Sequence, residues 1–290
     1  MTIIYIGLLV ALALFITVPA LYVLATYCML FYEKKLDERL HLVADLPLPA
    51  STIKLLQIMA AEICALWLTI FLWLMLGALK RPRKTNSSAG SNKPILLIHG
   101  YWHNQTGWFL LRRRLVRAGF GPIYSLNLFP VLSSIEHFGN QVAVLVEQIT
   151  KKEGSKELTL IGHSMGGLVA AYYAERLAPP GQVTDIITLG TPFGGTRTAA
   201  LGYGVCIEQM LPNSPFLADL SYWMQRGKGT YYYHIGTEWD GMIIPACSAF
   251  SGHPKASCIW LQNEGHMGLL YSSIVTRQVI EWLLLCKNKI

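Results

Sequence analysis

The sequence is short of charged residues. Asp, Glu, Lys and Arg make up only 14% of its 290 residues, whereas hydrophobic residues make up 52%. An ordinary soluble domain carries more charge and fewer apolar residues. The net charge of +7 comes from basic residues that are scattered or flank apolar runs, without a stripe of Lys and Arg interleaved with aromatic residues. We therefore expect no nucleic-acid binding, and we expect contacts to anionic lipid headgroups.

The sequence also lacks the cysteine spacing of a metal or redox site. Its six cysteines form no C-x-x-C pair, which argues against a zinc ribbon and against a thioredoxin-like motif. Two of them, Cys247 and Cys258, fall in one loop region and are a candidate disulfide pair. We expect neither a metal ion nor a cofactor, and the sequence contains no internal repeat.

Charge is absent altogether from Ile3 to Tyr32. About 20 residues of helix cross a bilayer, so this run predicts a transmembrane helix. A cleaved signal peptide fits poorly, because no basic residue precedes the run and no clear A-x-A site follows it. A second uncharged run, Ile63 to Leu79, predicts a second span, which extends back to Met59 if Glu62 lies near the membrane interface. The alternative for this run is an amphipathic helix that covers a globular domain.

These runs divide the chain into three parts. Residues 1–84 are predicted to form a two-helix transmembrane anchor, 85–92 a flexible polar linker, and 93–290 a globular domain. We expect an integral protein of a bacterial inner (cytoplasmic) membrane. The hairpin that joins the two helices and the segment after the second helix carry nearly equal numbers of basic residues. The first helix often decides the orientation, and its basic flank is the hairpin, which would then be cytoplasmic. This favours a domain outside the cytoplasm, where a Cys247–Cys258 disulfide would be stable.

From Lys93 onward, apolar runs alternate with helical patterns. Strands are predicted at residues 94–98, 122–128, 158–161, 183–189, 230–235 and 257–261, and helices at 108–118, 136–152, 164–177 and 269–286. This alternation is typical of an open, mostly parallel α/β sheet with helices on both faces. A long segment, about 191–229, interrupts it and is rich in Gly, Pro and large apolar residues. We expect a cap-like or lid-like insertion here, with Phe216 and Trp223, together with Trp102 from an earlier loop, lining an apolar substrate pocket.

The strongest local pattern is Gly162-His163-Ser164-Met165-Gly166, which lies between an apolar strand and a predicted helix. A G-x-S-x-G sequence in this context is typical of a nucleophile elbow, a sharp turn that holds a serine in a strained conformation. The glycines remove the Cβ atoms that would clash in such a turn. The alternative is a glycine-rich turn that contains a serine by chance.

A serine hydroxyl needs a base within hydrogen-bond reach, and the base needs an acid that orients it. His266 lies in a turn directly after the last predicted strand, whereas His253 precedes that strand and would lie at the opposite edge. The loop after the preceding strand offers Asp240 and Glu238 as acids. We prefer Asp240, because it precedes a glycine turn and an apolar run that ends in proline.

Two backbone N–H groups are needed to stabilise an oxyanion. Met165 follows the candidate nucleophile, and Tyr101 lies in the loop after the first strand of the globular domain, where Gly100 lets the backbone come close. We expect these two residues to be the donors. His99 and His163 are expected to have structural roles.

Together, His99-Gly100, the Gly162–Gly167 elbow, Asp240 and Gly265-His266 resemble the α/β-hydrolase lipases and esterases. The segment Leu189–Thr196 is similar to the G-T-P-x-x-G strand end of bacterial triacylglycerol lipases. The resemblance covers Lys93 to Ile290 and implies the α/β-hydrolase fold, with nucleophile, acid and base in the order Ser, Asp, His. Some such lipases bind calcium, but this sequence has no compact acidic cluster, so we do not extend that property to it.

The sequence therefore predicts a membrane-anchored serine hydrolase of carboxylic esters, a lipase or esterase, whose substrate is a lipid or another acyl ester. An acyltransferase or a thioesterase would use the same groups and is the first alternative. A non-catalytic interaction module on the membrane is the second, although such a module has no need of all three groups. No protein partner is predicted.

Overall fold

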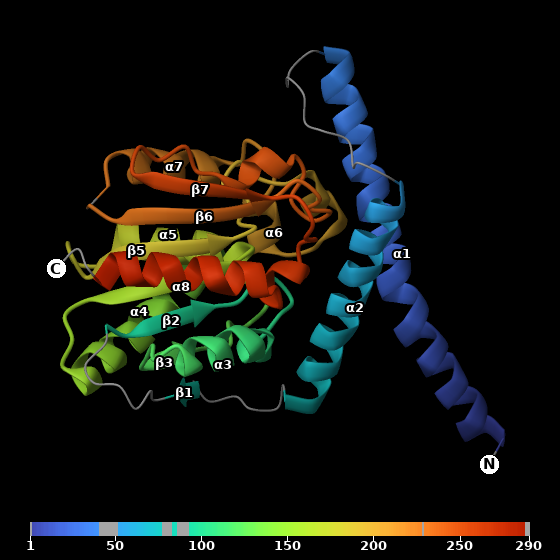
Figure 1. The fold of residues 1–290 in the computed structure, drawn as a ribbon, viewed down its shortest axis with the longest axis horizontal. Helices are drawn as coiled ribbons and strands as arrows, with labels where there is room; N and C mark the ends of the chain where they lie inside the picture. Colours follow the sequence, from blue (N-terminus) through green and yellow to red (C-terminus); the bar gives the residue numbers. More distant parts are fainter. Residues whose placement is uncertain (1, 41–51, 77–82, 86–92, 228, 288–290) are drawn as a thin grey trace.

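The computed structural model describes residues 2–40, 52–76, 83–85, 93–227 and 229–287 (Figure 1). The predicted linker, apart from Thr85, and most of the hairpin between the N-terminal helices lie outside these residues.

A seven-stranded sheet forms the centre of the globular domain, in the order β1-β3-β2-β4-β5-β6-β7. The six strands from β2 to β7 are parallel, and β1 pairs with β3 in the antiparallel sense. The continuous apolar runs explain the parallel arrangement, because strands that helices cover on both faces have no polar side. The strands are β1 (Arg83–Thr85), β2 (Ile95–Ile98), β3 (Ile123–Ser125), β4 (Leu158–His163), β5 (Val183–Leu189), β6 (Tyr231–Thr237) and β7 (Ala256–Leu261).

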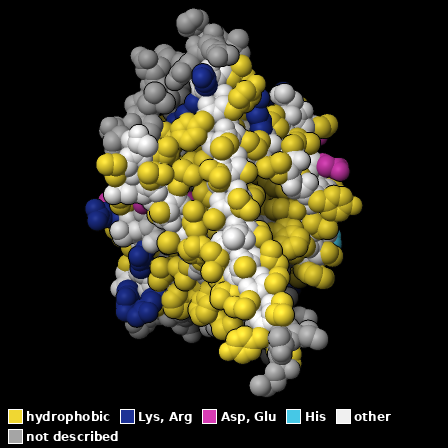
Figure 2. Space-filling model, turned by 90° about the vertical axis from the view of Figure 1, so that its right-hand side faces the viewer, with side chains coloured by type: hydrophobic (Ala, Val, Ile, Leu, Met, Phe, Trp, Pro, Cys, Tyr) yellow, Lys and Arg dark blue, Asp and Glu magenta, His cyan; other side chains and the backbone are white. Residues whose placement is uncertain are grey.

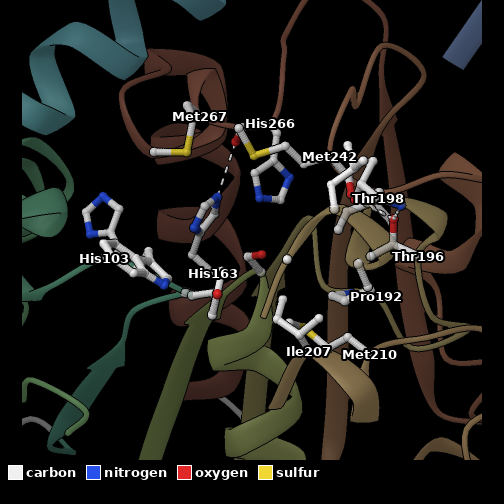
Figure 3. A pocket seen from close by; sticks show the side chains of 18 of the residues that line it. His103, His163, Pro192, Thr196, Thr198, Ile207, Met210, Met242, His266 and Met267 are labelled. Carbon is white, nitrogen blue, oxygen red and sulfur yellow. Dashed lines mark hydrogen bonds between the residues drawn. The ribbon is translucent and has the colours of Figure 1, made fainter. Parts of the chain in front are cut away.

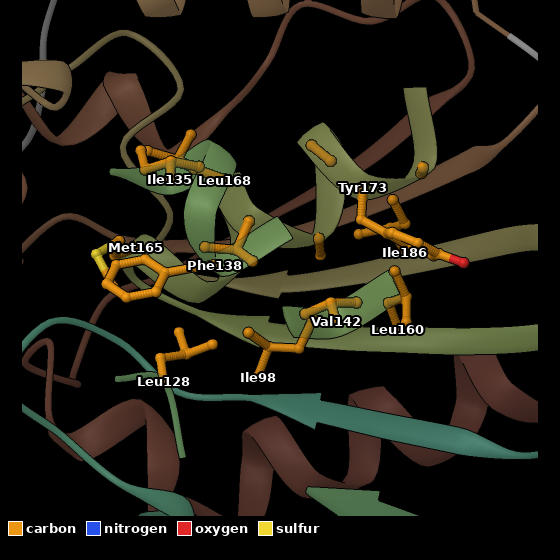
Figure 4. Close-up of a cluster of buried hydrophobic side chains, with 14 of the residues drawn as sticks. Ile98, Leu128, Ile135, Phe138, Val142, Leu160, Met165, Leu168, Tyr173 and Ile186 are labelled. Atoms are coloured by element: carbon orange, nitrogen blue, oxygen red, sulfur yellow. The ribbon is translucent and has the colours of Figure 1, made fainter. Parts of the chain in front are cut away.

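Helices cover both faces of this sheet (Figure 1). Helices α3 and α8 pack against each other on one face, and α4 and α5 do so on the other. Figure 4 shows part of the core beneath α4, in which Phe138 and Val142 belong to the same buried cluster as Leu160 and Ile186 of the sheet. The helices are α3 (Phe109–Arg117), α4 (Ile135–Glu153), α5 (Met165–Tyr172), which continues as a π-helical turn (Tyr173–Leu177), and α8 (Ser273–Lys287).

The insertion after β5 has two parts. Its first part contains the short helices η3 (Arg197–Leu201) and α6 (Val205–Gln209), and its second part is the longer helix α7 (Pro215–Gln225). Helix α7 packs beside α5 and its π-helical turn. Only the first part of the insertion contacts the cavity described below.

The two N-terminal helices, α1 (Thr2–Leu40) and α2 (Thr52–Leu76), lie side by side along one edge of the domain (Figure 1). The β2 arrow points towards them, so they lie at the carboxyl edge of the parallel sheet. The stretches Ile4–Leu36 and Thr52–Met75 are long and apolar enough to cross a membrane. An apolar cluster joins both helices to Trp239 and Ile244 of the domain.

The α/β architecture and the predicted strands from residue 94 onward are confirmed. Two expectations need correction. Residues 83–85 form the edge strand β1, so the predicted boundary between anchor and linker falls inside the sheet. No disulfide joins Cys247 and Cys258 in the structure: Cys258 lies on the edge strand β7, Cys247 lies in the 3₁₀ turn Ala246–Ala249, and both side chains are exposed. The preference for an oxidising compartment loses that support.

Candidate active site

Ser164 lies at the turn between β4 and α5 in a strained backbone conformation, with φ 54° and ψ −130°. Such a conformation is rare for a residue with a side chain and marks a constrained site. Close packing imposes it: a Cβ on Gly162 would lie 2.4 Å from the backbone nitrogen of Gly167. The Ser164 N–H also donates to the carbonyl of Leu189 on β5 at 2.8 Å. The predicted elbow is therefore present, and Ser164 sits at the carboxyl edge of the sheet.

His266 and Asp240 come together at the same edge, from the loops after β7 and β6. The distance from His266 Nδ1 to Asp240 Oδ2 is 2.9 Å, and both side chains are buried. The second carboxylate oxygen, Oδ1, accepts the N–H groups of Met242 and Ile243 at 2.9 and 2.8 Å. Because Nδ1 donates to the carboxylate, the other ring nitrogen of His266 is left to accept a proton.

A glycine at the end of β5 leaves room for this pair. Gly190 has φ 54°, and a Cβ there would lie 3.0 Å from both Asp240 Oδ2 and His266 Nδ1. Any larger residue would therefore be strained and would also press on the Asp240–His266 hydrogen bond. This explains the glycine in the G-T-P-x-x-G segment.

The electrostatic surroundings favour a basic His266. Burial lowers the pKa of His266, but the charge of Asp240 and its hydrogen bond raise that pKa by more, so the pKa lies above its ordinary value. The ring of His163 lies beside that of His266, with 4.6 Å between the ring centroids and a tilt of 47° between the ring planes. Burial, followed by the charge of His266, holds the pKa of His163 well below its ordinary range. Neutral His163 donates from Nε2 to the His266 carbonyl at 3.2 Å, as the dashed line in Figure 3 shows.

The loop after β2 lies against Ser164, since a Cβ on Gly100 would be 2.9 Å from Ser164 Cβ. This places the backbone of Tyr101 near the candidate nucleophile, with Met165 directly after it in the chain. His99 supports this loop by accepting the Leu128 N–H at 2.9 Å and donating to the Gly100 carbonyl at 2.8 Å. Burial lowers the His99 pKa to about 3, so this imidazole is neutral and structural, as predicted.

A cavity of about 330 Å³ opens in front of Ser164 and His266. Its walls include Ile207 and Met210 of the insertion and Met242 of the Asp240 loop (Figure 3). Trp102, predicted as a pocket residue, also lines it.

Phe216 and Trp223, predicted to line the same pocket, lie elsewhere. Both are on α7, where their rings pack at 6.1 Å from that of Tyr172. Arg176 also lies 4.4 Å from the Trp223 ring. The prediction failed because α7 joins the helical layer over α5, whereas the segment before it turns towards the site. The Leu201 and Met210 side chains of that earlier segment line the cavity instead.

Two further groups of residues line the cavity, and local sequence patterns do not indicate either of them. The first comes from the N-terminal helices: Tyr22 of α1, and Leu66, Thr69 and Ile70 of α2. The second is His103, a buried residue whose Nε2 has no hydrogen-bond partner among the described residues. In the part of the chain that the structure describes, no group of three or more His, Cys, Asp or Glu side chains could hold a metal ion.

Comparison with known proteins concerns the family and the fold of the chain. A model of the alpha/beta hydrolase family matches residues 95–271, which is more than half of the chain. The chain belongs to the α/β-hydrolase family. The mature form of Bacillus licheniformis lipase BlEst2 superimposes with a TM-score of 0.62 at 14% identity, over 70% of this chain and 98% of that one. At this identity the similarity concerns the fold of the α/β-hydrolase.

Two curated relatives are triacylglycerol lipases. The lipase of Pseudarthrobacter phenanthrenivorans is 29% identical over 119 residues, which are 38% of this chain and 36% of that protein. The lipase of Burkholderia plantarii is also 29% identical over 119 residues, which are 32% of its length. The chain thus matches about a third of each of these lipases.

Replacing Asp240 with Asn tests the role of the buried carboxylate. The amide keeps the shape but loses the charge, so we expect kcat/KM for p-nitrophenyl acetate to fall by about 10⁴, as in serine proteases. Glu238→Gln is the matched control, because Glu238 is the other acid of the same loop. If Glu238→Gln is the more damaging change, Asp240 is not the acid.

Proposed function

We propose that this α/β-hydrolase is a membrane-anchored serine hydrolase that cleaves carboxylic esters through an acyl-enzyme. The observation that carries the proposal is the meeting, at one cavity, of a strained Ser164 and a His266 that is hydrogen-bonded to buried Asp240. The triacylglycerol lipases among the relatives support a lipid ester as the substrate. The two span-length N-terminal helices support attachment to a membrane.

In the first half of the reaction, Ser164 Oγ attacks the acyl carbonyl while His266 Nε2 takes the serine proton. Asp240 holds the ring in the tautomer that this needs, and it stabilises the imidazolium that forms. The backbone N–H groups of Tyr101 and Met165 stabilise the oxyanion of the tetrahedral intermediate. His266 then gives its proton to the leaving alcohol, and the acyl group stays on Ser164.

In the second half, a water molecule replaces the alcohol. His266 removes a proton from this water as it attacks the acyl-enzyme, and returns the proton to Ser164 Oγ when the acid leaves. The raised pKa of His266 suits both steps, because a stronger base takes a proton from serine or water more readily.

Replacing Ser164 with Ala removes the nucleophile. We expect hydrolysis of p-nitrophenyl esters to fall by up to about 10⁶ in kcat, because the three groups act as a unit. Labelling by a fluorophosphonate probe should disappear as well. Hydrolysis that stays close to the wild-type rate would show that another residue is the nucleophile.

A further inference from the structure

The N-terminal helices do more than lie beside the domain, because they form part of the cavity wall. Tyr22 of α1, together with Leu66 and Ile70 of α2, lines the same cavity as Ser164. The two α2 residues lie inside the span-length stretch Thr52–Met75, in its C-terminal half. If α2 is embedded in a bilayer, the cavity is therefore beside the hydrocarbon layer.

The surface around the cavity is also apolar. Figure 2 shows that hydrophobic side chains cover most of the face on which the helices lie, and continue onto the neighbouring domain. Trp102 and Leu201, which line the cavity, are 66% and 60% exposed, and Tyr203 beside them is 78% exposed. Tyr203 is hydrogen-bonded to the proposed oxyanion donor Tyr101, because Tyr101 Oη donates to the Tyr203 carbonyl at 2.7 Å. Exposed apolar surface of this kind marks a contact with a membrane or another apolar partner.

Building on the proposed ester hydrolysis, we propose that α1 and α2 form the acyl-binding wall of the site. The substrate is then a lipid of the bilayer, whose acyl chain reaches Ser164 along these helices from the hydrocarbon layer. The chain moves from one apolar medium to another, so it never has to cross water. The lipid bilayer is the partner that fits, because the apolar face is continuous with two helices of span length.

Filling the wall tests this proposal. Ile70→Trp places a larger side chain in the cavity, whereas Leu68→Trp puts the same ring on an exposed position of α2. The full-length variants are reconstituted in phosphatidylcholine vesicles and assayed with p-nitrophenyl palmitate and p-nitrophenyl acetate. Burying one methylene group of the acyl chain strengthens binding roughly fourfold. If the tryptophan removes the room for two methylene groups, kcat/KM of Ile70→Trp for the palmitate ester should fall about tenfold or more.

Acetate hydrolysis by Ile70→Trp should fall much less than its palmitate hydrolysis, and both activities of Leu68→Trp should stay near wild type. Unchanged palmitate hydrolysis by Ile70→Trp, or an equal loss on acetate and palmitate, would overturn the proposal. These outcomes differ from failure of the proposed function, in which the wild-type protein would hydrolyse neither ester.

A separate observation concerns Glu62, the acidic residue in the apolar α2. Its side chain is 2% exposed. Oε1 accepts the N–H of Met267 at 2.8 Å, and Oε2 accepts the N–H of Gly268 at 3.1 Å. Both donors belong to the turn that directly follows His266. A Cβ on Gly265 would lie 2.2 Å from Glu62 Oε2, so this turn touches the carboxylate closely on both sides of His266.

A carboxylate in the middle of an apolar helix is costly, and it usually has a specific partner and a function. Here the partners are the backbone N–H groups of buried Met267 and of partly buried Gly268, and leaving them unpaired would cost free energy. We infer that Glu62 is a positioning residue: it holds the turn of His266 so that the imidazole faces Ser164. The helix pair would then complete the active site as well as attach it to the membrane.

Substituting Glu62 separates positioning from simple docking of the helices. In Glu62→Ala both N–H groups lose their acceptor, and a small displacement of His266 should lower kcat for p-nitrophenyl acetate by about 10²-fold. KM should change little, because acetate makes few contacts with the wall. Glu62→Gln should recover most of the activity, since its amide oxygen still accepts the Met267 N–H.

Glu33→Ala is the matched control. Glu33 is a buried acid of α1 that also joins a helix to the domain, through an ion pair with Arg197 at 2.9 Å, but it does not line the cavity. We expect its kcat to stay near wild type. An unchanged kcat in Glu62→Ala, or an equal fall in Glu33→Ala, would overturn the positioning role.

Discussion

The strained backbone at Ser164 is the constraint on which the rest of the site depends. The turn from β4 to α5 is so tight that a Cβ on Gly162 would lie 2.4 Å from the Gly167 nitrogen. Ser164 is thereby forced to a positive φ at the carboxyl edge of the sheet. The loops after β2, β6 and β7 end at the same edge, because the strands are parallel. Tyr101, Asp240 and His266 can therefore approach one serine from three separate segments.

The same edge is where the N-terminal helices lie. Tyr27 of α1 donates from Oη to the Trp239 carbonyl at 3.0 Å, next to Asp240, and Glu62 of α2 accepts from the turn beside His266. Each helix thus contacts one of the two loops that carry Asp240 and His266. If the helices attach the protein to a membrane and these residues are catalytic, as we propose, the attachment is coupled to the chemistry, because a shift of the helices would displace those loops. An anchor joined only by a flexible linker would have no such effect.

The parts of the site that depend on local sequence could be predicted. The elbow is a pattern of five consecutive residues, and Asp240 and His266 follow strands that their apolar runs reveal. Contacts between distant segments could not be predicted in the same way. Hydropathy marks Phe216 and Trp223 as apolar, but it does not show that α7 turns towards Tyr172 and away from the cavity. From the sequence alone, a position of Glu62 near a membrane interface is a condition for a longer second span, because nothing local shows that its carboxylate accepts from a turn about 200 residues later.

Trapping the acyl-enzyme tests whether Ser164 is the nucleophile. The full-length protein would be mixed with p-nitrophenyl palmitate in vesicles, quenched with acid within the first turnover, and digested for peptide mass spectrometry. We expect a palmitoyl group on the peptide that contains Ser164, formed as p-nitrophenol is released and lost as palmitate appears. Continued hydrolysis with the acyl group on a cysteine, or with no acylated peptide at all, would contradict this expectation.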